Sequence, residues 1–319
     1  MDKMPLVSVI TPFYNDIRYF PETLESYFSQ TYPNIEMILI DDGSDLKPDA
    51  LIPPEPKYPV RIIRSPKGKV GPGGARNLGI CQAGGELIAF LDSDDIWKPE
   101  FVKKCVELFL KDKDVDWVYA DGYYIIDGKP VKKPNSAYFG FKNGLPKGRE
   151  VNELHLKGYA FEMMSANIVR RSTIEKTGFF NEDLAISEDW DFFCRIGENF
   201  RVDAVDEPLI YYRKRSDGFH YTRLDNYVNV HSDILRRSYE RQRLLPQRNV
   251  DLSRAIALSY ERVGIQYLNK GFPRQARYYL THELTRPIGF SLRTIGLKTL
   301  SFLPAPFYKA ALRVYELMI

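Results

Sequence analysis

One apolar segment of this sequence ends abruptly in a cluster of acidic residues. The run ELIAFL, residues 86–91, is followed by Asp92, Asp94 and Asp95 within four positions. Like charges at this spacing repel one another, and burial beside an apolar strand makes the repulsion more costly. We therefore expect something positively charged to lie against these carboxylates.

A second apolar run, IEMILI, ends in the same way at Asp41 and Asp42. Strand-like and helix-like segments alternate along this half of the chain, which predicts an α/β fold with a mostly parallel sheet covered by helices on both faces. Ligands of such sheets bind at the carboxyl ends of the strands, where both acidic clusters lie. The expected strands are residues 6–10, 35–40, 60–63, 86–91 and 116–120, and the expected helices are residues 21–30, 71–83 and 99–111.

The sheet region is interrupted once. Residues 128–150 are rich in Gly, Pro and Lys and have no clear period, which indicates either an excursion from the core or a plain surface linker. Strand-like sequence resumes at 165–171, and residues 187–199 predict a helix with Ser187 as its N-cap. The runs FRVDAV and PLIYYR complete the expected sheet.

From about residue 225 the pattern is helical only. Residues 259–287 predict two helices joined at Gly271, with the spacing of a tetratricopeptide unit, although a single copy does not make a solenoid. Residues 290–319 are amphipathic, and both an interfacial helix and a helix packed against protein remain open. We expect a sheet-containing domain at 1–222 and a helical region at 223–319.

Charge is divided unevenly between these regions. Residues 226–319 contain 15 of the 45 Lys and Arg and 6 of the 42 Asp and Glu, which leaves 30 and 36 for residues 1–225. The basic part could face an anionic surface, such as the cytoplasmic side of a membrane. Nucleic-acid binding is not expected, because the net charge is only +3 and no recognition module is present.

The remaining composition points to a cytoplasmic protein. The three cysteines, Cys81, Cys105 and Cys194, are too widely spaced for a disulfide framework or a zinc site, so we expect buried, reduced thiols. No run approaches the roughly 18 apolar residues of a membrane-spanning helix. The N-terminus lacks the apolar core of a signal peptide, because Pro5 and a strand-like pattern arrive at once.

The acidic cluster at 92–95 suits a divalent cation. Carboxylates bind hard cations such as Mg²⁺ or Mn²⁺, and magnesium is often shared between one or two carboxylates and the phosphates of a substrate. An Asp-x-Asp sequence alone is weak evidence, because most such sequences are turns or solvated acids. Its position directly after a buried strand strengthens the metal hypothesis.

Three further motifs could contribute to the same site. Asp41 and Asp42 could accept hydrogen bonds from a ribose or a base, although Asp-Gly-Ser is also good turn chemistry. Residues 71–77 place glycines before a helix, which permits close approach of a ligand, and this is not a dinucleotide fingerprint because it does not follow the first strand. Glu188 and Asp189 could hold a catalytic base, although acids are common at a helix N-terminus for structural reasons.

In this order, the motifs resemble those of the family 2 glycosyltransferases, inverting enzymes with the Rossmann-like GT-A fold. The resemblance covers residues 5 to about 215. Each motif is weak by itself, but six in order with suitable spacing are specific. The matching segments are VSVITPFYN (7–15), IDDGSD (40–45), GGARNLGI (73–80), AFLDSDD (89–95), GFFNEDL (178–184) and SEDWDFFCRI (187–196).

The resemblance implies a role for each group. Asp94 would ligate a divalent Mn²⁺ or Mg²⁺ ion, with Asp92 at the ribose or the water shell of the metal. Asp189 would be the general base, with Glu188 as its neighbour or substitute, and Trp190 would pack near the sugar or in the core. The residues expected to bind the nucleotide sugar are Thr11, Pro12, Tyr14, Asp41, Asp42, Arg76, Asn77, Asp92, Ser93 and Asp94.

The implied reaction is a single displacement that inverts the anomeric carbon. The donor would be a nucleoside diphosphate sugar, with uridine diphosphate as the commonest case in the family. The acceptor would be a glycan or a lipid-linked sugar of polysaccharide or cell-envelope synthesis, reached in the cytoplasm or at the cytoplasmic face of the membrane through the basic C-terminal helices.

One segment departs from the family pattern. Relatives often have a histidine soon after the last strand, whereas this chain has Arg213, Lys214 and Arg215 there and His220 later. A third protein ligand to the metal is therefore in doubt, and the basic side chains could contact the diphosphate or be solvated. Two alternatives remain: a non-catalytic sugar-nucleotide- or carbohydrate-binding relative, and a metal-dependent phosphatase, whose acid pair would normally follow the first strand.

Overall fold

The computed structural model describes residues 4–66, 68–215, 224–242, 251–270, 272–282 and 301. The chain separates into two compact units, one formed by residues 1–152 and 160–218 and the other by 153–159 and 219–319. Within the described ranges, no helix is both long enough and apolar enough to cross a membrane.

The first half of the sheet is parallel and follows the predicted alternation. Its strands lie in the order β3-β2-β1-β4, and each pairs in parallel with its neighbour. Strands β1, β2 and β4 are almost completely buried and mostly apolar, as expected for strands covered on both faces, whereas β3 at the sheet edge is only partly buried. The bounds are β1 Val7–Phe13, β2 Ile35–Asp41, β3 Val60–Arg64 and β4 Leu87–Phe90.

The second half of the sheet is mixed. Strand β8 lies antiparallel between β4 and β6, β9 is parallel to β6, and β5 and β7 pair antiparallel with β9 and β6. The sheet is thus mostly parallel in direction, with short reversed strands inserted. The bounds are β5 Ile96–Trp97, β6 Trp117–Ile126, β7 Lys129–Pro134, β8 Asn167–Arg170 and β9 Val202–Lys214.

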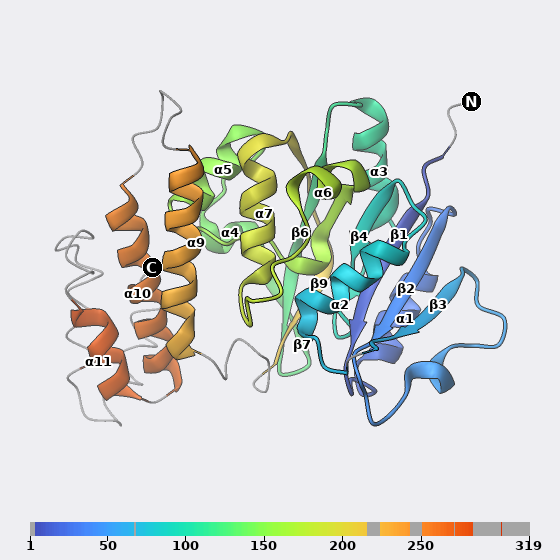
Figure 1. Cartoon of the computed structure of the whole chain (residues 1–319), viewed down its shortest axis with the longest axis horizontal. Coiled ribbons are helices and arrows are strands. Elements are labelled where there is room, and N and C mark those ends of the chain that lie inside the picture. The colour runs from blue at the N-terminus through green and yellow to red at the C-terminus, as the bar shows by residue number, and fades with distance from the viewer. Residues whose placement is uncertain are drawn as a thin grey trace. The chain divides into compact units, whose positions relative to one another are not determined.

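Helices cover both faces of this sheet (Figure 1). Helices α1 (Phe20–Phe28) and α3 (Phe101–Lys111) pack on the face to which Val9, Met37 and Ala89 point. Helix α2 (Gly71–Gln82) lies on the opposite face, where Gly79 comes so close to Ile10 that an added Cβ would be 2.5 Å from its Cγ2 atom. Helix α7 (Glu188–Asn199) packs there too, since Phe192 contacts Phe90 edge-on.

Several predicted elements differ in extent. Strand β1 continues through Thr11 to Phe13, and the two final strand-like runs form the single strand β9. The irregular segment 128–150 is structured rather than a plain linker. It contains β7, α4 (Asn135–Phe139) and the start of α5 (Arg149–Leu156). The remaining short elements are η1 Pro48–Leu51, η2 Met164–Ala166 and α6 Arg171–Thr177.

One local prediction was confirmed only in part, and another was wrong for one residue. Ser187 occupies the N-cap position of α7, but its backbone is left-handed with φ 58° and its side chain forms no capping hydrogen bond. Cys81 is exposed, because it lies on the outer side of α2, whereas Cys105 and Cys194 are buried; all three are free thiols.

The described residues of the second unit beyond residue 223 form helices. They are α9 (Leu224–Gln242), α10 (Leu252–Lys270) and α11 (Pro273–Thr281). Helix α10 packs against α11, and an added Cβ at Gly264 would be 2.5 Å from Leu280 Cγ. Gly271, His220 and nearly all of the predicted amphipathic segment 290–319 lie outside the described residues.

Candidate active site

A single buried arginine joins two of the acidic motifs. Arg76 Nη2 donates to Asp92 Oδ1 at 2.7 Å, and Arg76 Nη1 donates to Glu188 Oε1 at 2.8 Å. Burial opposes the charge on Arg76, but Asp92 and Glu188 outweigh it and hold the guanidinium pKa above its ordinary value. The sheet edge after β4 and the start of α7 are therefore held together through α2.

The glycines of α2 make this contact possible. An added Cβ at Gly73 would lie 3.2 Å from Glu188 Cγ, and one at Gly74 would lie 3.0 Å from Val70 Cβ. Larger residues would push α7 away from α2, so the close approach depends on the absence of side chains.

The three carboxylates after β4 have different environments. Asp95 is completely buried, and its oxygens accept hydrogen bonds from Ser165 Oγ at 2.5 Å and from the Arg213 amide at 2.9 Å. Asp92 and Asp94 keep about a quarter of their side-chain surface exposed, at 26% and 23%. Asp95 is therefore a structural group, whereas Asp92 and Asp94 are accessible to a ligand.

Asp94 lies among other negative charges. Burial raises its pKa to about 7, and the charges of Asp92 and Asp16 add to this shift. Asp16 itself accepts a hydrogen bond of 2.9 Å from Ser93 Oγ. The acids at this end of the sheet therefore need a positively charged partner to be ionised together.

Positive charge comes from the end of β9. Arg215 Nη1 lies 2.9 Å from Asp16 and 3.4 Å from Asp94. Arg213 Nε donates to the backbone oxygen of Asp94 at 2.9 Å, and its Nη2 atom forms an ion pair with Glu22 at 3.0 Å. Together with Arg76, these arginines supply the positive partner that the sequence led us to expect.

The acids after β2 hold loops in place. Asp42 accepts hydrogen bonds from the amides of Val70 at 2.9 Å and Gly71 at 3.0 Å, and Asp41 accepts one from the Ser44 amide at 2.9 Å. Burial raises the pKa of Asp42 although these two amide bonds oppose the shift. Asp42 thereby fixes the loop that opens α2, and each of its oxygens retains a lone pair for a ligand.

An exposed pair borders the same loop. Lys69 Nζ lies 4.2 Å from the centre of the Tyr14 ring, and the Tyr14 side chain is 42% exposed. A cation over a tyrosine ring holds both side chains in position, so the ring lies in a defined place next to Asp42.

Helix α7 begins with acids of unequal accessibility. Glu188 is buried and bonded to Arg76, whereas Asp189 is half-buried and accepts a hydrogen bond from the Trp190 amide at 2.8 Å. Burial and the charge of Asp189 raise the pKa of Glu188, and Arg76 opposes this shift. Asp189 is thus the acid of this pair that a substrate could reach.

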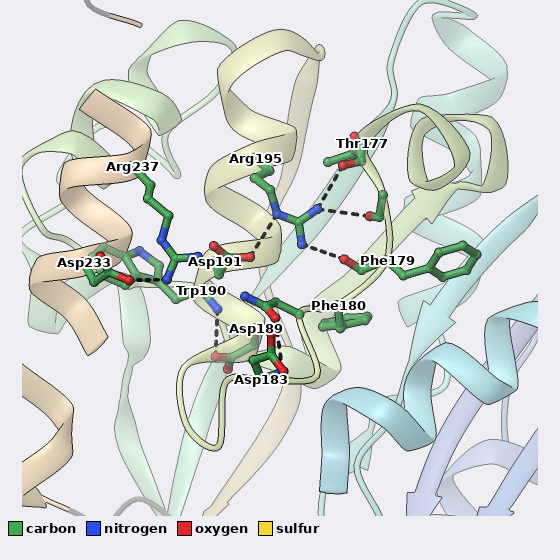
Figure 2. A network of polar contacts seen from close by, with 12 residues as sticks. Thr177, Phe179, Phe180, Asp183, Asp189, Trp190, Asp191, Arg195, Asp233 and Arg237 are labelled. Atoms are coloured by element: carbon green, nitrogen blue, oxygen red, sulfur yellow. Dashed lines mark hydrogen bonds and ion pairs between the residues drawn. The ribbon is translucent and has the colours of Figure 1, made fainter. Parts of the chain in front are cut away.

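A second arginine, Arg195, connects the first turn of α7 to the loop that precedes the helix (Figure 2). Arg195 Nε forms an ion pair of 2.9 Å with Asp191, and its Nη atoms donate to the carbonyls of Thr177, Gly178 and Phe179. Asp191 is therefore a structural residue that ties α7 to the preceding loop.

The family model for "Glycosyl transferase family 2" matches residues 8–178, which is more than half of the sequence. The chain belongs to glycosyl transferase family 2. Its match begins in β1 and includes both acidic clusters and the loop that opens α2. This assignment favours glycosyl transfer over the phosphatase alternative.

Curated relatives of this glycosyltransferase are about 30% identical to it. An uncharacterized glycosyltransferase of Methanocaldococcus jannaschii is 30% identical over 67% of this chain and 72% of its own length. The succinoglycan biosynthesis protein ExoW of Rhizobium meliloti is 30% identical over 60% and 63%, and the minor teichoic acid biosynthesis protein GgaA of Bacillus subtilis is 30% identical over 66% and 48%. The chain therefore spans less than two thirds of the last two relatives.

Solved structures share the fold. S. aureus TarS 1–349 in complex with UDP-GlcNAc has a TM-score of 0.62 at 20% identity, with 96% of this chain and 88% of TarS covered. The mannosyltransferase PcManGT from Pyrobaculum calidifontis, in complex with GDP-Man and Mn²⁺, has a TM-score of 0.61 at 18% identity, with 97% and 83% covered. Both confirm the expected GT-A architecture.

The glycosyltransferase brings its predicted motifs together around α2. Asp42 bonds to the loop at its start, Arg76 joins Asp92 to Glu188, and Asp189 is close enough to Arg76 for its charge to act there. Five of the predicted nucleotide-binding side chains are buried: Thr11, Asp41, Asp42, Arg76 and Asn77. Thr11 lies inside β1 because the strand runs on, and its Oγ1 atom has no hydrogen-bond partner.

Asn77 has a positioning role in the structure. Its Nδ2 atom donates to the carbonyl of Phe180 at 2.9 Å and to Glu182 Oε1 at 2.8 Å, and its Oδ1 atom accepts from the Phe180 amide. It therefore holds the loop before α7 rather than offering its amide to a nucleotide.

Sequence reasoning did not single out Asp16, Glu22 or Ser165, although all three bind groups of the acidic loop or its arginines. No local signal marks them, because their partners are far away in the sequence. The arginines at 213 and 215 were noticed, but as contacts of the diphosphate or solvated groups rather than as partners of Asp94 and Asp16.

The described residues fit a metal site that is shared with a substrate. Across the described residues, no group of three His, Cys, Asp or Glu side chains could hold a metal ion. Asp92 and Asp94 nevertheless lie together, partly exposed, in an excess of negative charge. Two hard oxygen ligands of this kind suit a cation whose remaining ligands are phosphate and water.

Proposed function

We propose that this chain transfers a sugar, with inversion, from a nucleoside diphosphate sugar to a hydroxyl group of a glycan or lipid-linked acceptor. The main support is the bridge from Asp92 through Arg76 to Glu188, because it brings donor-side and acceptor-side acids to one place. Family membership and neighbours solved with UDP-GlcNAc and GDP-Man support a nucleotide sugar as donor.

The nucleotide would bind along β1, β2 and the start of α2. Tyr14 offers an exposed ring, and Asp42 offers its remaining lone pairs to a ribose hydroxyl or a base N–H. We expect a uridine diphosphate donor, and a guanosine diphosphate donor is the other candidate given the neighbour with GDP-Man.

Asp92 and Asp94 would hold a divalent cation, with Mn²⁺ favoured because PcManGT was solved with this ion. When bound, the cation neutralises negative charge on the diphosphate leaving group. Arg76 keeps Asp92 oriented, and Arg215 places a further positive charge beside Asp94.

Asp189 would act as the general base. It is half-buried in the first turn of α7, beside buried Glu188. An ionised carboxylate can accept the proton of an acceptor hydroxyl as that oxygen attacks the anomeric carbon. Glu188 is buried and bonded to Arg76, so we assign it to positioning.

The first experiment measures release of the nucleoside diphosphate from UDP-glucose, UDP-N-acetylglucosamine, UDP-galactose and GDP-mannose with Mn²⁺ present. Turnover of one donor supports the proposal. Binding of a nucleoside diphosphate with neither transfer nor hydrolysis of any donor would favour the non-catalytic alternative instead.

The second experiment tests the base. Asp189→Asn should lower turnover by about 10²- to 10⁴-fold, the usual contribution of a general base, while calorimetric affinity for the nucleoside diphosphate stays close to wild type. Asp183→Asn is the matched control, since Asp183 is an exposed carboxylate in the loop before α7. Full turnover by Asp189→Asn would show that another group is the base.

A further inference from the structure

A segment of unusual composition lies outside the proposed donor site. Residues 128–149 contain five lysines and one arginine but no Asp or Glu. They form β7 and α4 and lead into α5, and β7 pairs with β6, which in turn pairs with β9 (Figure 1). The segment thus lies against the same two strands that lead into the acidic site.

Three tyrosines connect this segment to β9. The ring of Tyr124 on β6 lies 6.0 Å from that of Tyr212 on β9 and 5.6 Å from that of Tyr138 on α4. Both contacts are edge-on, and Tyr138 at the outer end is 50% exposed. We call these tyrosines, with Lys133 and Lys214, the tyrosine–lysine strip.

The two lysines lie over tyrosine rings. Lys214 Nζ is 3.8 Å from the centre of the Tyr124 ring, and Lys133 Nζ is 4.5 Å from that of Tyr138. Neither lysine forms an ion pair with a carboxylate among the described residues. The ring attracts the cation without neutralising it, although burial lowers the pKa of Lys214.

One end of the strip adjoins the acidic loop after β4. Arg213 donates to this loop through its amide, to Asp95, and through Nε, to the Asp94 carbonyl. Tyr212, the preceding residue of β9, is close enough to Asp95, Asp94 and Asp189 for their charges to act on it. A molecule lying on the strip would therefore reach from exposed Tyr138 and Lys133 to the site where the acceptor hydroxyl must react.

We propose that the tyrosine–lysine strip binds the acceptor and that this acceptor is an anionic glycan, with phosphate or carboxylate groups along its chain. The inference rests on the proposed function, because only a transferase needs an acceptor there. Tyrosine rings suit the apolar C–H faces of sugars, and lysines without carboxylate partners suit anions. A lipid surface is less suitable, because the strip leads into the acidic loop after β4.

The first test measures binding of the wild-type chain to three end-labelled polymers by fluorescence anisotropy. The probes are poly(glycerol phosphate), oligogalacturonate and neutral dextran of similar length. We expect at least tenfold tighter binding to one of the anionic polymers than to dextran, with affinity that falls as salt rises. The anionic polymer that binds more tightly identifies phosphate or carboxylate as the preferred anion. Equal affinity for dextran would overturn the proposal.

The variants locate the binding surface. Lys133→Met with Lys214→Met should weaken the anionic polymer about tenfold or more, whereas Lys133→Arg should keep the affinity. Tyr138→Leu, at a position that is 50% exposed, should also weaken it severalfold. Lys111→Met is the control, because Lys111 is exposed at the end of α3. Wild-type affinity in both the double lysine variant and Tyr138→Leu would overturn the proposal.

Two readouts separate the competing explanations. The first is binding to vesicles of phosphatidylglycerol and phosphatidylcholine. If the wild type binds these vesicles, the double lysine variant does not, and neither polymer is bound, the strip is a membrane surface and the glycan proposal is overturned. Failure of the proposed function would appear separately, as absence of binding of UDP or GDP with Mn²⁺ by the wild-type chain.

Discussion

Arg76 and Glu188 are 112 positions apart in the sequence, yet Arg76 Nη1 donates a 2.8 Å hydrogen bond to Glu188 Oε1 inside the protein. Both side chains are almost completely buried, at 4% and 8% exposed. Because Arg76 also bonds to Asp92, this one guanidinium fixes the distance between the proposed metal ligands and the proposed base.

Arg76→Met should destabilise the protein and abolish turnover. Removing one partner of a buried ion pair leaves the other charge unpaired and typically costs about 3–5 kcal/mol. Urea denaturation should show this loss. The double variant Arg76→Met, Glu188→Gln should recover part of the stability but none of the activity, because Asp92 still lacks its partner. Equal stability of the single and double variants would show that the pair is not coupled.

Asp94→Asn and Asp95→Asn should separate ligand binding from folding. Asp94 is partly exposed, so its variant should fold normally and need at least tenfold more Mn²⁺ for half-maximal donor turnover. Asp95 is fully buried with both oxygens bonded, so its variant should lose about 1–3 kcal/mol of stability. Metal titration and thermal denaturation should be carried out on both variants. A stability loss in Asp94→Asn and a higher Mn²⁺ requirement in Asp95→Asn would mean that Asp95 binds the metal and Asp94 is structural.

The sequence predicts the parallel half of the sheet well, because its signal is local. The apolar runs of β1, β2 and β4 are buried on both faces, and their short, continuous apolar sequence by itself predicts a buried strand. The direction of β8 is a different matter, since pairing of Asn167–Arg170 with β4 and β6 depends on residues far away along the chain. Local sequence cannot set whether such a short strand runs parallel or antiparallel.

The sequence predicts the acidic residues of the site, but it does not predict the residues that bond to them. Carboxylates after apolar strands stand out, but nothing near Asp95 reveals that Ser165 and Arg213 satisfy it, whereas Asp94 is left partly exposed. Likewise, Ser187 is a typical N-cap residue, yet its left-handed backbone prevents the usual capping bond. Tertiary packing decides these details, so a motif identifies a candidate residue without assigning its role.

Gly79→Ala should lower stability without a direct effect on the site. Its Cβ would lie 2.5 Å from Ile10 Cγ2, which forces α2 away from β1, and overpacking of this kind typically costs about 1–3 kcal/mol. Gln82→Ala, an exposed change in the same helix, is the control for helix propensity. Urea midpoints that do not differ between the two variants would mean that the interface adapts without cost.

Arg215→Met should weaken binding of a nucleoside diphosphate more than binding of the nucleoside. Arg215 lies 3.4 Å from Asp94 and 2.9 Å from Asp16. Its positive charge offsets these two carboxylates, which would otherwise repel a diphosphate. Its loss leaves an uncompensated negative charge on the phosphate side only. Calorimetry with UDP and uridine should show a loss of fivefold or more for UDP and almost none for uridine. An equal loss for both ligands would mean that Arg215 supports the shape of the whole nucleotide site, and an unchanged UDP affinity would place the diphosphate away from the end of β9.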